Sequence, residues 1–360
     1  MSTYTEEELD TYSEEDFEQV PPADIVAFNE LRSCSDLVRL YKKGKLDIQP
    51  PFQREKVWRP KDYTRFIDSL IKQLPIPSMC FSLDYKTQKW QVIDGLQRMS
   101  SIIKFLKEEN WRFSKLDDID PRISGISSKI MQDESSDKYE LYERVENLTL
   151  PITVLRCDLS KKAHNNYLFT IFHRLNTGGT KLNNQEIRNC IYSGSFNDKL
   201  KELNETDGWK TINNIKEDRQ YRFATVELIL RLFAFYDRLP DYKGKLARFL
   251  NEYMEDHKEP DEEFLNEKEV LFNNTVNIIV NSIQPNLLHD LNLTVLEALI
   301  YGCAKNNDTL QGKQPEQITQ AFNALKKAEE FSAESLKGGL AAKEKVQTRL
   351  NKAEEIMGNA

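Results

Sequence analysis

Hydrophobic and polar positions follow two periods in the first half of the chain and a single period in the second half. In the first half, a stripe of apolar residues at helical spacing spans 63–74, and short apolar runs typical of buried strands occupy 79–83, 90–93 and 150–156. From about residue 221 onward the apolar positions recur at the i, i+3, i+4 spacing of helices. The pattern therefore predicts an α+β fold, in which a small mixed α/β core precedes a mainly helical domain.

Local signals predict where several elements begin. Ser35 is expected to cap a short helix, and Pro60 suits the first position of the helix that follows. The segment 110–147 is polar and weakly patterned, so it predicts loops and short helices. The stretch from about 315 to 357 is rich in Ala, Lys and Glu and predicts one or two surface helices, broken by a pair of glycines.

Charged residues are distributed unevenly along the chain, with an excess of acidic residues at the N-terminus. Residues 1–30 contain ten Asp and Glu and no Lys or Arg, and removing these ten charges from the total of −8 leaves the rest with +2. We expect residues 1–30 to form an acidic disordered tail, 31–195 the α/β core and 196–360 the helical domain. The tail is typical of solvated segments; the alternative is that it competes for an anion site in its own chain.

The cysteines and the apolar runs indicate the cellular compartment of the protein. The number of cysteines is odd and none forms a CxxC pair, which predicts reduced core thiols; they are Cys34, Cys80, Cys157, Cys190 and Cys303. No apolar leader precedes them, and no run approaches the ~18 apolar residues that a membrane span needs. A soluble, cytoplasmic protein without a membrane partner is therefore expected.

The segment VIDGLQRMSSIIKFL, residues 92–106, contains the first candidate site. Its strand turns into a helix at Asp94 and Gly95, so Arg98 falls in the first turn, where backbone N–H groups lack partners and the dipole is positive. Asp94 and Gln97 have the spacing of a capping box, which explains both without any ligand. The capping box does not explain Arg98, because a cation at the N-terminal end of a helix requires a nearby anion. We therefore expect Arg98 to face a negatively charged group, such as a bound phosphate.

Two further segments offer candidate ligands for an anion. In PPFQREKVW, Arg54 is either a second phosphate ligand or a surface residue in a salt bridge, and Trp58 either anchors the loop in the core or stacks on a base. We favour the core anchor for Trp58. In LNTGGTKLNNQEIRN, the glycines before a helix form either a phosphate cradle or an ordinary corner between two helices. Asn176, Arg188 and Thr180 would contribute ligands if this loop faces the first site.

Other residues have plain explanations. Glu227 and Arg231 have i, i+4 spacing and are expected to form a surface ion pair, just after Arg219 and Arg222. The four histidines show no metal-ligand spacing, and His164 is expected to be packed rather than catalytic. HExxH, GxSxG and the lysine-bearing P-loop are absent, so a nucleotide site would depend on Arg and backbone donors.

Taken in order over roughly residues 33–235, these motifs resemble the N-terminal domain of GmrSD-type restriction endonucleases, a family of the ParB/sulfiredoxin-like superfamily. The resemblance implies a ParB-like core whose DGQQR signature binds a nucleoside triphosphate with Mg²⁺ and supports its hydrolysis. It also implies a role in bacterial defence against phage or modified DNA. The positions that match the family motifs are Gln53, Arg54, Asp94, Gly95, Gln97, Arg98, Asn176, Gly178, Gly179, Gln185 and Arg188.

On this resemblance each residue of the first site has an expected role. Arg98 and the N–H groups after Gly95 would hold phosphate oxygens, while Arg54 would neutralise charge in the transition state. Gln97 would position water, and Asp94 would cap the helix or contact the metal, whose full ligand set we leave unassigned. Leu96 replaces the first glutamine of the signature, which weakens the case for hydrolysis more than the case for binding.

Two alternatives remain open at this point. The chain could be a non-catalytic module that presents Arg54, Arg188, Arg219 and Arg222 to DNA or recruits a separate nuclease subunit. Nuclease action by this chain alone is disfavoured, because the region after 235 offers only two histidines, far apart, for an HNH-type centre.

Overall fold

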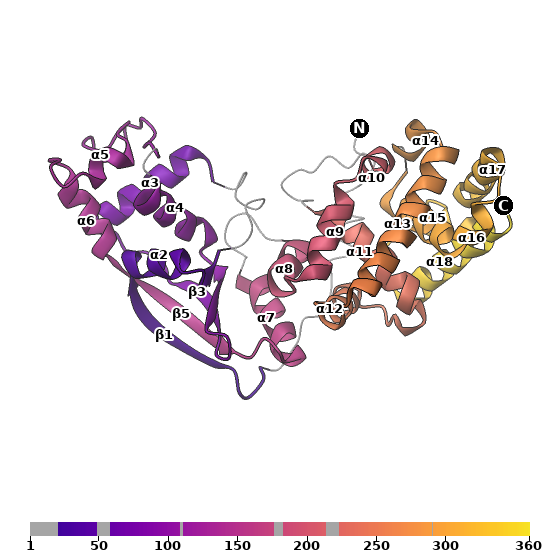
Figure 1. The fold of residues 1–360 in the computed structure, drawn as a ribbon, viewed down its shortest axis with the longest axis horizontal. Coiled ribbons are helices and arrows are strands. Elements are labelled where there is room, and N and C mark those ends of the chain that lie inside the picture. Colours follow the sequence, from indigo (N-terminus) through magenta and orange to yellow (C-terminus); the bar gives the residue numbers. More distant parts are fainter. Residues whose placement is uncertain (1–20, 49–57, 109–110, 176–182, 214–222, 290) are drawn as a thin grey trace. The chain divides into compact units, whose positions relative to one another are not determined.

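The structure, a computed structural model, confirms the expected α+β fold (Figure 1). It describes residues 21–48, 58–108, 111–175, 183–213, 223–289 and 291–360. The chain forms two compact units: the N-terminal unit ends at Lys181, and the helical unit continues from Leu182 to the C-terminus.

A five-stranded mixed sheet forms the centre of the N-terminal unit. Its strands are β1 (Val26–Ser33), β2 (Leu46–Asp47), β3 (Met79–Asp84), β4 (Lys89–Asp94) and β5 (Thr149–Cys157). Their order in the sheet is β1-β5-β3-β4-β2. Strand β5 runs antiparallel to β1 and parallel to β3, β3 runs antiparallel to β4, and β4 runs parallel to β2. The three apolar runs of the sequence thus become the three inner strands, as their hydrophobicity predicts.

Strand β1 corrects the expectation that residues 1–30 form a disordered tail. Residues 26–30 belong to this strand, which pairs with β5 from Val26 opposite Arg156 to Ser33 opposite Thr149. Pairing with β5 supplies the backbone partners that a solvated tail would take from water. The strand also moves the next helix cap from Ser35 to Ser33, whose Oγ accepts the N–H of Asp36 at 3.1 Å.

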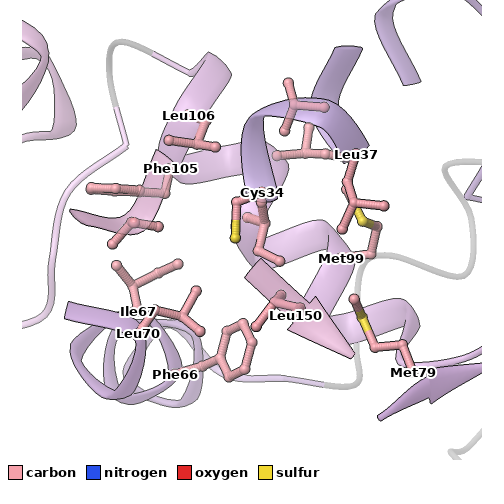
Figure 2. Packing of buried hydrophobic residues seen from close by; sticks show 14 of the residues in the cluster. Cys34, Leu37, Phe66, Ile67, Leu70, Met79, Met99, Phe105, Leu106 and Leu150 are labelled. Carbon is pink, nitrogen blue, oxygen red and sulfur yellow. The ribbon is translucent and has the colours of Figure 1, made fainter. Parts of the chain in front are cut away.

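Helices cover one face of this sheet and enclose the core of the N-terminal unit (Figure 1). They are α2 (Cys34–Lys42), α3 (Pro60–Ile71), α4 (Leu96–Lys107), α5 (Ser128–Gln132) and α6 (Tyr139–Asn147). Figure 2 shows Phe66, Ile67 and Leu70 of α3 packed with Met99 of α4 and Leu150 of β5. Burial of such side chains contributes roughly 1.5–3 kcal/mol each, so the stripe that predicts α3 also fixes α3 on the sheet.

The remaining helix of this unit, α7 (Lys162–Leu175), follows β5 and contacts β4. It buries Leu168 and Phe172, whereas Leu175 at its C-terminal end is 43% exposed.

The helical unit contains no strand within its described residues. Its α-helices are α8 (Asn184–Ile191), α9 (Ser195–Asn204), α10 (Asp207–Ile212), α11 (Ala224–Arg238), α12 (Leu246–Asp256), α13 (Glu262–Ser282), α14 (Pro285–His289), α15 (Leu293–Lys305), α16 (Asn307–Leu310), α17 (Pro315–Lys327) and α18 (Lys343–Gly358). Helix α15 is buried from Leu293 to Ala304 and contacts α11, α13, α17 and α18. Because it is buried on every side, α15 forms the centre of the unit.

Helix α18 corrects the expectation of surface helices near the C-terminus. It buries Val346, Leu350, Ala353 and Met357, and it packs on α15. The expected break at the glycine pair is confirmed, since Gly338 and Gly339 both have positive φ between α17 and α18.

Two expectations about the whole chain can be compared with the structure. All five cysteines are free and buried. Among the helices of the described residues, none has both the length and the apolar character required to cross a bilayer.

Candidate functional site

The candidate site is the turn between β4 and α4, which the DGLQR segment forms. Gly95 is the N-cap of α4, with φ 96° and ψ 16°, and no side chain caps the helix. The expectation that Asp94 caps it is therefore wrong. Asp94 lies at the end of β4 opposite Cys80, and its carboxylate accepts the guanidinium of Arg98 rather than a backbone N–H of the first turn. The N–H groups of the first turn, from Leu96 to Arg98, have no acceptor within the helix.

The negatively charged group that Arg98 faces is the carboxylate of Asp94, in the same chain. Its guanidinium donates to Oδ2 of Asp94 at 2.8 Å, and also to the backbone oxygens of Pro77 and Ser78. The Arg98 side chain is only 15% exposed, whereas that of Asp94 is 38% exposed. Burial lowers the pKa of Arg98, and the charge of Asp94 opposes this shift. Arg98 thus ties the end of β4 to the segment that leads into β3.

The glycine at 95 is required for steric reasons. A Cβ atom added there would lie 2.6 Å from Cγ of Met79, whose side chain is fully buried. Its positive φ also favours glycine over any residue with a side chain. The turn therefore combines a left-handed conformation with close packing against β3.

Gln97 forms a hydrogen bond with Tyr63, an aromatic residue of the core. Its Oε1 accepts the hydroxyl of Tyr63 at 3.0 Å, which leaves the Nε2 hydrogens as donors. Trp58 packs edge-on against Tyr63 and Phe66, with ring centroids 5.7 and 5.6 Å apart. The expected role of Trp58 as a core anchor is confirmed. Leu96, at the position of the missing glutamine, packs partly buried against the same core.

Five of the family-motif residues cannot be placed. Gln53, Arg54, Asn176, Gly178 and Gly179 lie outside the described residues, as do Thr180, Arg219 and Arg222. Their proposed contacts stay predictions.

Gln185 and Arg188 lie in the interior of the helical unit, each 1% exposed. Arg188 donates from Nη1 to Oε2 of Glu227 at 2.9 Å and from Nε to Oδ1 of Asn251 at 2.8 Å. Gln185 accepts from Arg188 at 3.2 Å. Structural partners thus engage both side chains. The hypothesis that Arg188 is presented to DNA is wrong, because a buried guanidinium cannot reach a phosphate backbone.

The same cluster corrects the expected surface ion pair. Arg231 binds Oε1 of Glu227, but its side chain is 3% exposed and it also reaches Glu297 at 3.4 Å. Burial works to raise the pKa of Glu227, yet Arg231 and Arg188 outweigh it and hold that pKa below its ordinary value. Sequence spacing identified one pair, but it missed Asn251 and Glu297 because both come from distant helices.

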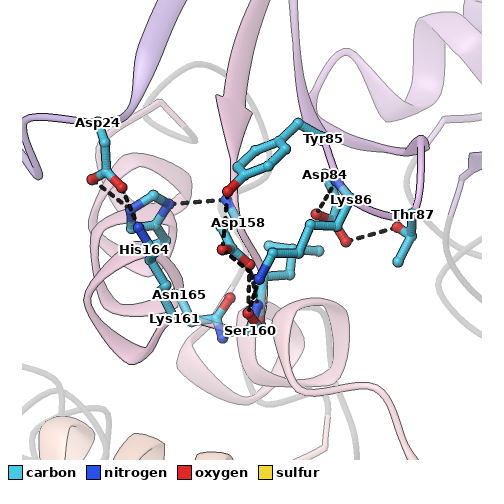
Figure 3. A network of polar contacts seen from close by, with 11 residues as sticks. Asp24, Asp84, Tyr85, Lys86, Thr87, Asp158, Ser160, Lys161, His164 and Asn165 are labelled. Carbon is cyan, nitrogen blue, oxygen red and sulfur yellow. Dashed lines mark hydrogen bonds and ion pairs between the residues drawn. The ribbon is translucent and has the colours of Figure 1, made fainter.

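A second polar cluster joins β5 and α7 to the β3–β4 turn (Figure 3). His164 is 1% exposed; its Nδ1 accepts the N–H of Asp158 and its Nε2 lies 2.9 Å from Oδ1 of Asp24. Asp158 in turn binds Ser160 and Lys86, which lower the pKa of its carboxyl. His164 is packed, as expected.

The exposed end of this cluster gives a pH prediction. Hydrogen bonds from Lys161 and His164 lower the pKa of Asp24 from 3.8 to about 2. Because the folded-state pKa is the lower one, the stabilisation is complete above pH 3.8 and is lost as the pH falls towards 2. In an NMR titration we expect Lys161→Met to raise the pKa of Asp24, and Lys89→Met, at an exposed position, to leave it unchanged. A pKa of Asp24 near 3.8 in the unaltered protein would contradict the contact.

The described residues contain no group of three or more His, Cys, Asp or Glu side chains arranged to hold a metal ion. What the fold does define is an α+β domain with a strand–glycine–helix turn, a geometry that suits anions.

Comparison with known proteins identifies the domain. Residues 34–193 match the model of the family described as GmrSD restriction endonuclease, N-terminal domain. This stretch of the chain is thus similar to that family, and the similarity suggests a defence role related to restriction endonucleases. The match begins at the first residue of α2 and ends just after α8, so β1 and the rest of the helical unit lie outside it. No curated protein matches the chain.

Proposed function

We propose that the N-terminal unit binds the phosphate groups of a nucleoside triphosphate at the turn between β4 and α4, and that it provides the nucleotide-dependent step in a restriction-endonuclease-related defence system. One observation supports this best: α4 begins at a glycine, and no side chain forms a capping hydrogen bond with its first turn. Three N–H groups and the positive end of the helix dipole therefore remain for a ligand, as at other phosphate sites.

The arrangement of charge fits a metal-bound phosphate better than a bare one. Asp94 uses Oδ2 for Arg98, and its side chain is 38% exposed. Mg²⁺ in nucleotide sites takes one or two protein carboxylates together with phosphate oxygens and water. Asp94 is the residue that would hold it, and the metal would neutralise phosphate charge.

We assign Arg98 and Gln97 roles that differ from those that the family signature implies. Arg98 becomes a positioning residue, because it binds Asp94 and two backbone oxygens of the β3 approach. Gln97, fixed at Oε1 by Tyr63, keeps its Nε2 donors for a phosphate oxygen or a water molecule. We propose binding with slow hydrolysis or none, since Leu96 supplies no polar group.

Replacing Asp94 with asparagine tests this arrangement in two directions. Asp94→Asn removes the carboxylate that would hold Mg²⁺ and also leaves the charge of Arg98 without its counterion. We therefore expect about tenfold weaker binding of nucleoside triphosphate with Mg²⁺ present, a loss of ~1.4 kcal/mol, and tighter binding of the metal-free nucleotide. Calorimetric titration with each of the four common nucleotides, with and without Mg²⁺, measures both effects.

A matched control comes from the same unit. Asp118 also pairs with an arginine, Arg65 at 2.8 Å, but its side chain is 57% exposed and belongs to a surface pair. Asp118→Asn should leave both titrations unchanged. Equal weakening by Asp94→Asn with and without Mg²⁺ would indicate only a damaged turn. If the unaltered protein bound none of the four nucleotides, the proposed function would be wrong.

A further inference from the structure

Strand β1 leaves a long edge of the sheet without a partner strand. In the part of the chain that the structure describes, the sheet ends at β1, which has eight residues, and at β2, which has two. Three of the eight exposed large hydrophobic side chains among the described residues lie on β1: Val26 at 49%, Phe28 at 38% and Leu31 at 70%. Apolar exposure is thus concentrated on the strand whose backbone is also open.

Edges of this kind are normally protected. Proteins place lysine, proline or outward charges on exposed edges, because open backbone groups pair with other chains. Strand β1 has no lysine or proline, and the guanidinium of Arg32 turns to Glu30 and Asp36, both at 2.6 Å. The strand also precedes the family match, which starts at Cys34. Strand β1 thus lacks the lysine or proline that usually protects an open edge.

We propose that β1 pairs antiparallel with β1 of a second copy of this chain, so that two sheets join into one. Antiparallel neighbours in one sheet are related by a two-fold axis perpendicular to it. This axis keeps each face of the sheet on the same side in both copies. Two residues can therefore lie opposite each other only if both are odd-numbered or both are even-numbered. Only registers centred on a residue satisfy this condition, which reduces the choice to a few.

Charge and strand length select one register. Centring the pair on Glu30 would place this carboxylate directly against its own copy, which is unfavourable. Centring it on Phe28 would need Asp24 in a strand, whereas Asp24 lies in a turn. Centring it on Asn29 keeps residues 26–32 paired without like charges in opposition, so we assign this register.

This register covers the exposed apolar side chains. Leu31 faces Ala27 of the second copy, and Phe28 faces the aliphatic part of Glu30. Val26 faces the stem of Arg32. A two-fold pair uses the β1 edge of both copies, so no third copy can bind there. The two-residue strand β2 at the other edge is too short to extend the sheet further. A second copy is therefore the occupant that the strand itself fits.

A pair of charge variants tests both the association and the register. Ala27 and Leu31 are exposed, lie on one face and are far apart within a copy, but they are directly opposite across the proposed axis. Ala27→Glu with Leu31→Glu places like charges opposite each other twice, and should weaken dimerisation about tenfold. Ala27→Lys with Leu31→Glu alters the same positions but creates two opposite-charge pairs, and should keep the dimer.

Sedimentation velocity of the full chain over a concentration series measures these effects, and circular dichroism verifies that each variant is folded. Cross-linking gives a second readout. Asn29→Cys should form a disulfide between copies under mild oxidation, whereas Ala27→Cys should not, because residue 27 faces residue 31. The native cysteines are buried, so they do not compete. A monomer at all concentrations, or equal behaviour of the two charge variants, would overturn the proposal.

Discussion

Arg188→Ala is expected to lower the free energy of unfolding by about 3–5 kcal/mol, because it leaves the largely buried carboxylate of Glu227, 18% exposed, with only one of its two arginine partners. Arg188 is 1% exposed and joins α8 to Glu227 on α11 and to Asn251 on α12. Removing the guanidinium therefore breaks an ion pair and a hydrogen bond together, and opens a cavity the size of a long side chain. Urea denaturation followed by circular dichroism measures the loss.

Two controls separate the buried charge from other effects. Arg248 pairs with Glu252 at 2.8 Å on the surface, with side chains 63% and 47% exposed, so Arg248→Ala should cost less than about 1 kcal/mol. Arg188→Met combined with Glu227→Leu removes both charges and fills much of the space. This double variant should be more stable than Arg188→Ala, because no unpaired charge remains in the interior. If Arg188→Ala cost no more than Arg248→Ala, the ion pair would contribute little to the fold.

The sequence predicts this fold well where hydrophobicity alone decides. The stripe of α3 is buried as far as Ile71, although Leu74 beyond the helix is 49% exposed, and the apolar runs form β3, β4 and β5 where the pattern places them. Strand β1 was missed because its acidic surroundings dominate the composition, while its stability depends on pairing with β5 more than a hundred residues later. Non-local pairing of this kind leaves no periodic signal in a short window.

The candidate site was predicted in its residues but not in its contacts. Asp94 and Arg98 are four residues apart, so an ion pair between them could have been inferred from spacing. Assigning Asp94 to a helix cap hid that possibility. The burial of Arg231 could not be predicted from the sequence, because its second partner, Glu297, lies 66 residues away on α15. Exposed and buried i, i+4 pairs look the same in a sequence.

The Asp94–Arg98 pair also changes what the turn can do. Without a ligand, the pair is neutral and holds β4 to the approach of β3, so the first turn of α4 stays open but the local charge is balanced. A metal on Asp94 would weaken its hold on Arg98 and make the turn more positive. On the proposed function, metal and phosphate therefore bind more tightly together than either does alone.

Gly95→Ala is expected to lower the free energy of unfolding by about 2–5 kcal/mol, through two separate costs. A non-glycine residue in a left-handed conformation costs roughly 1–2 kcal/mol, and forcing a methyl group into a packed core costs typically 1–3 kcal/mol. At this position the added Cβ would lie 2.6 Å from Cγ of Met79, which is buried and cannot move into solvent. Thermal and urea unfolding measure the sum.

Gly44 provides the matched control, since it belongs to the same unit and has φ 64°, yet a Cβ there would meet nothing within 4 Å. Gly44→Ala should therefore show only the conformational cost, about 1–2 kcal/mol. Adding Met79→Ala to Gly95→Ala removes the clashing atom, so the double variant should lose less stability than the two single losses combined. Equal losses for Gly44→Ala and Gly95→Ala would mean that Met79 does not restrict the turn, and strict additivity with Met79→Ala would lead to the same conclusion.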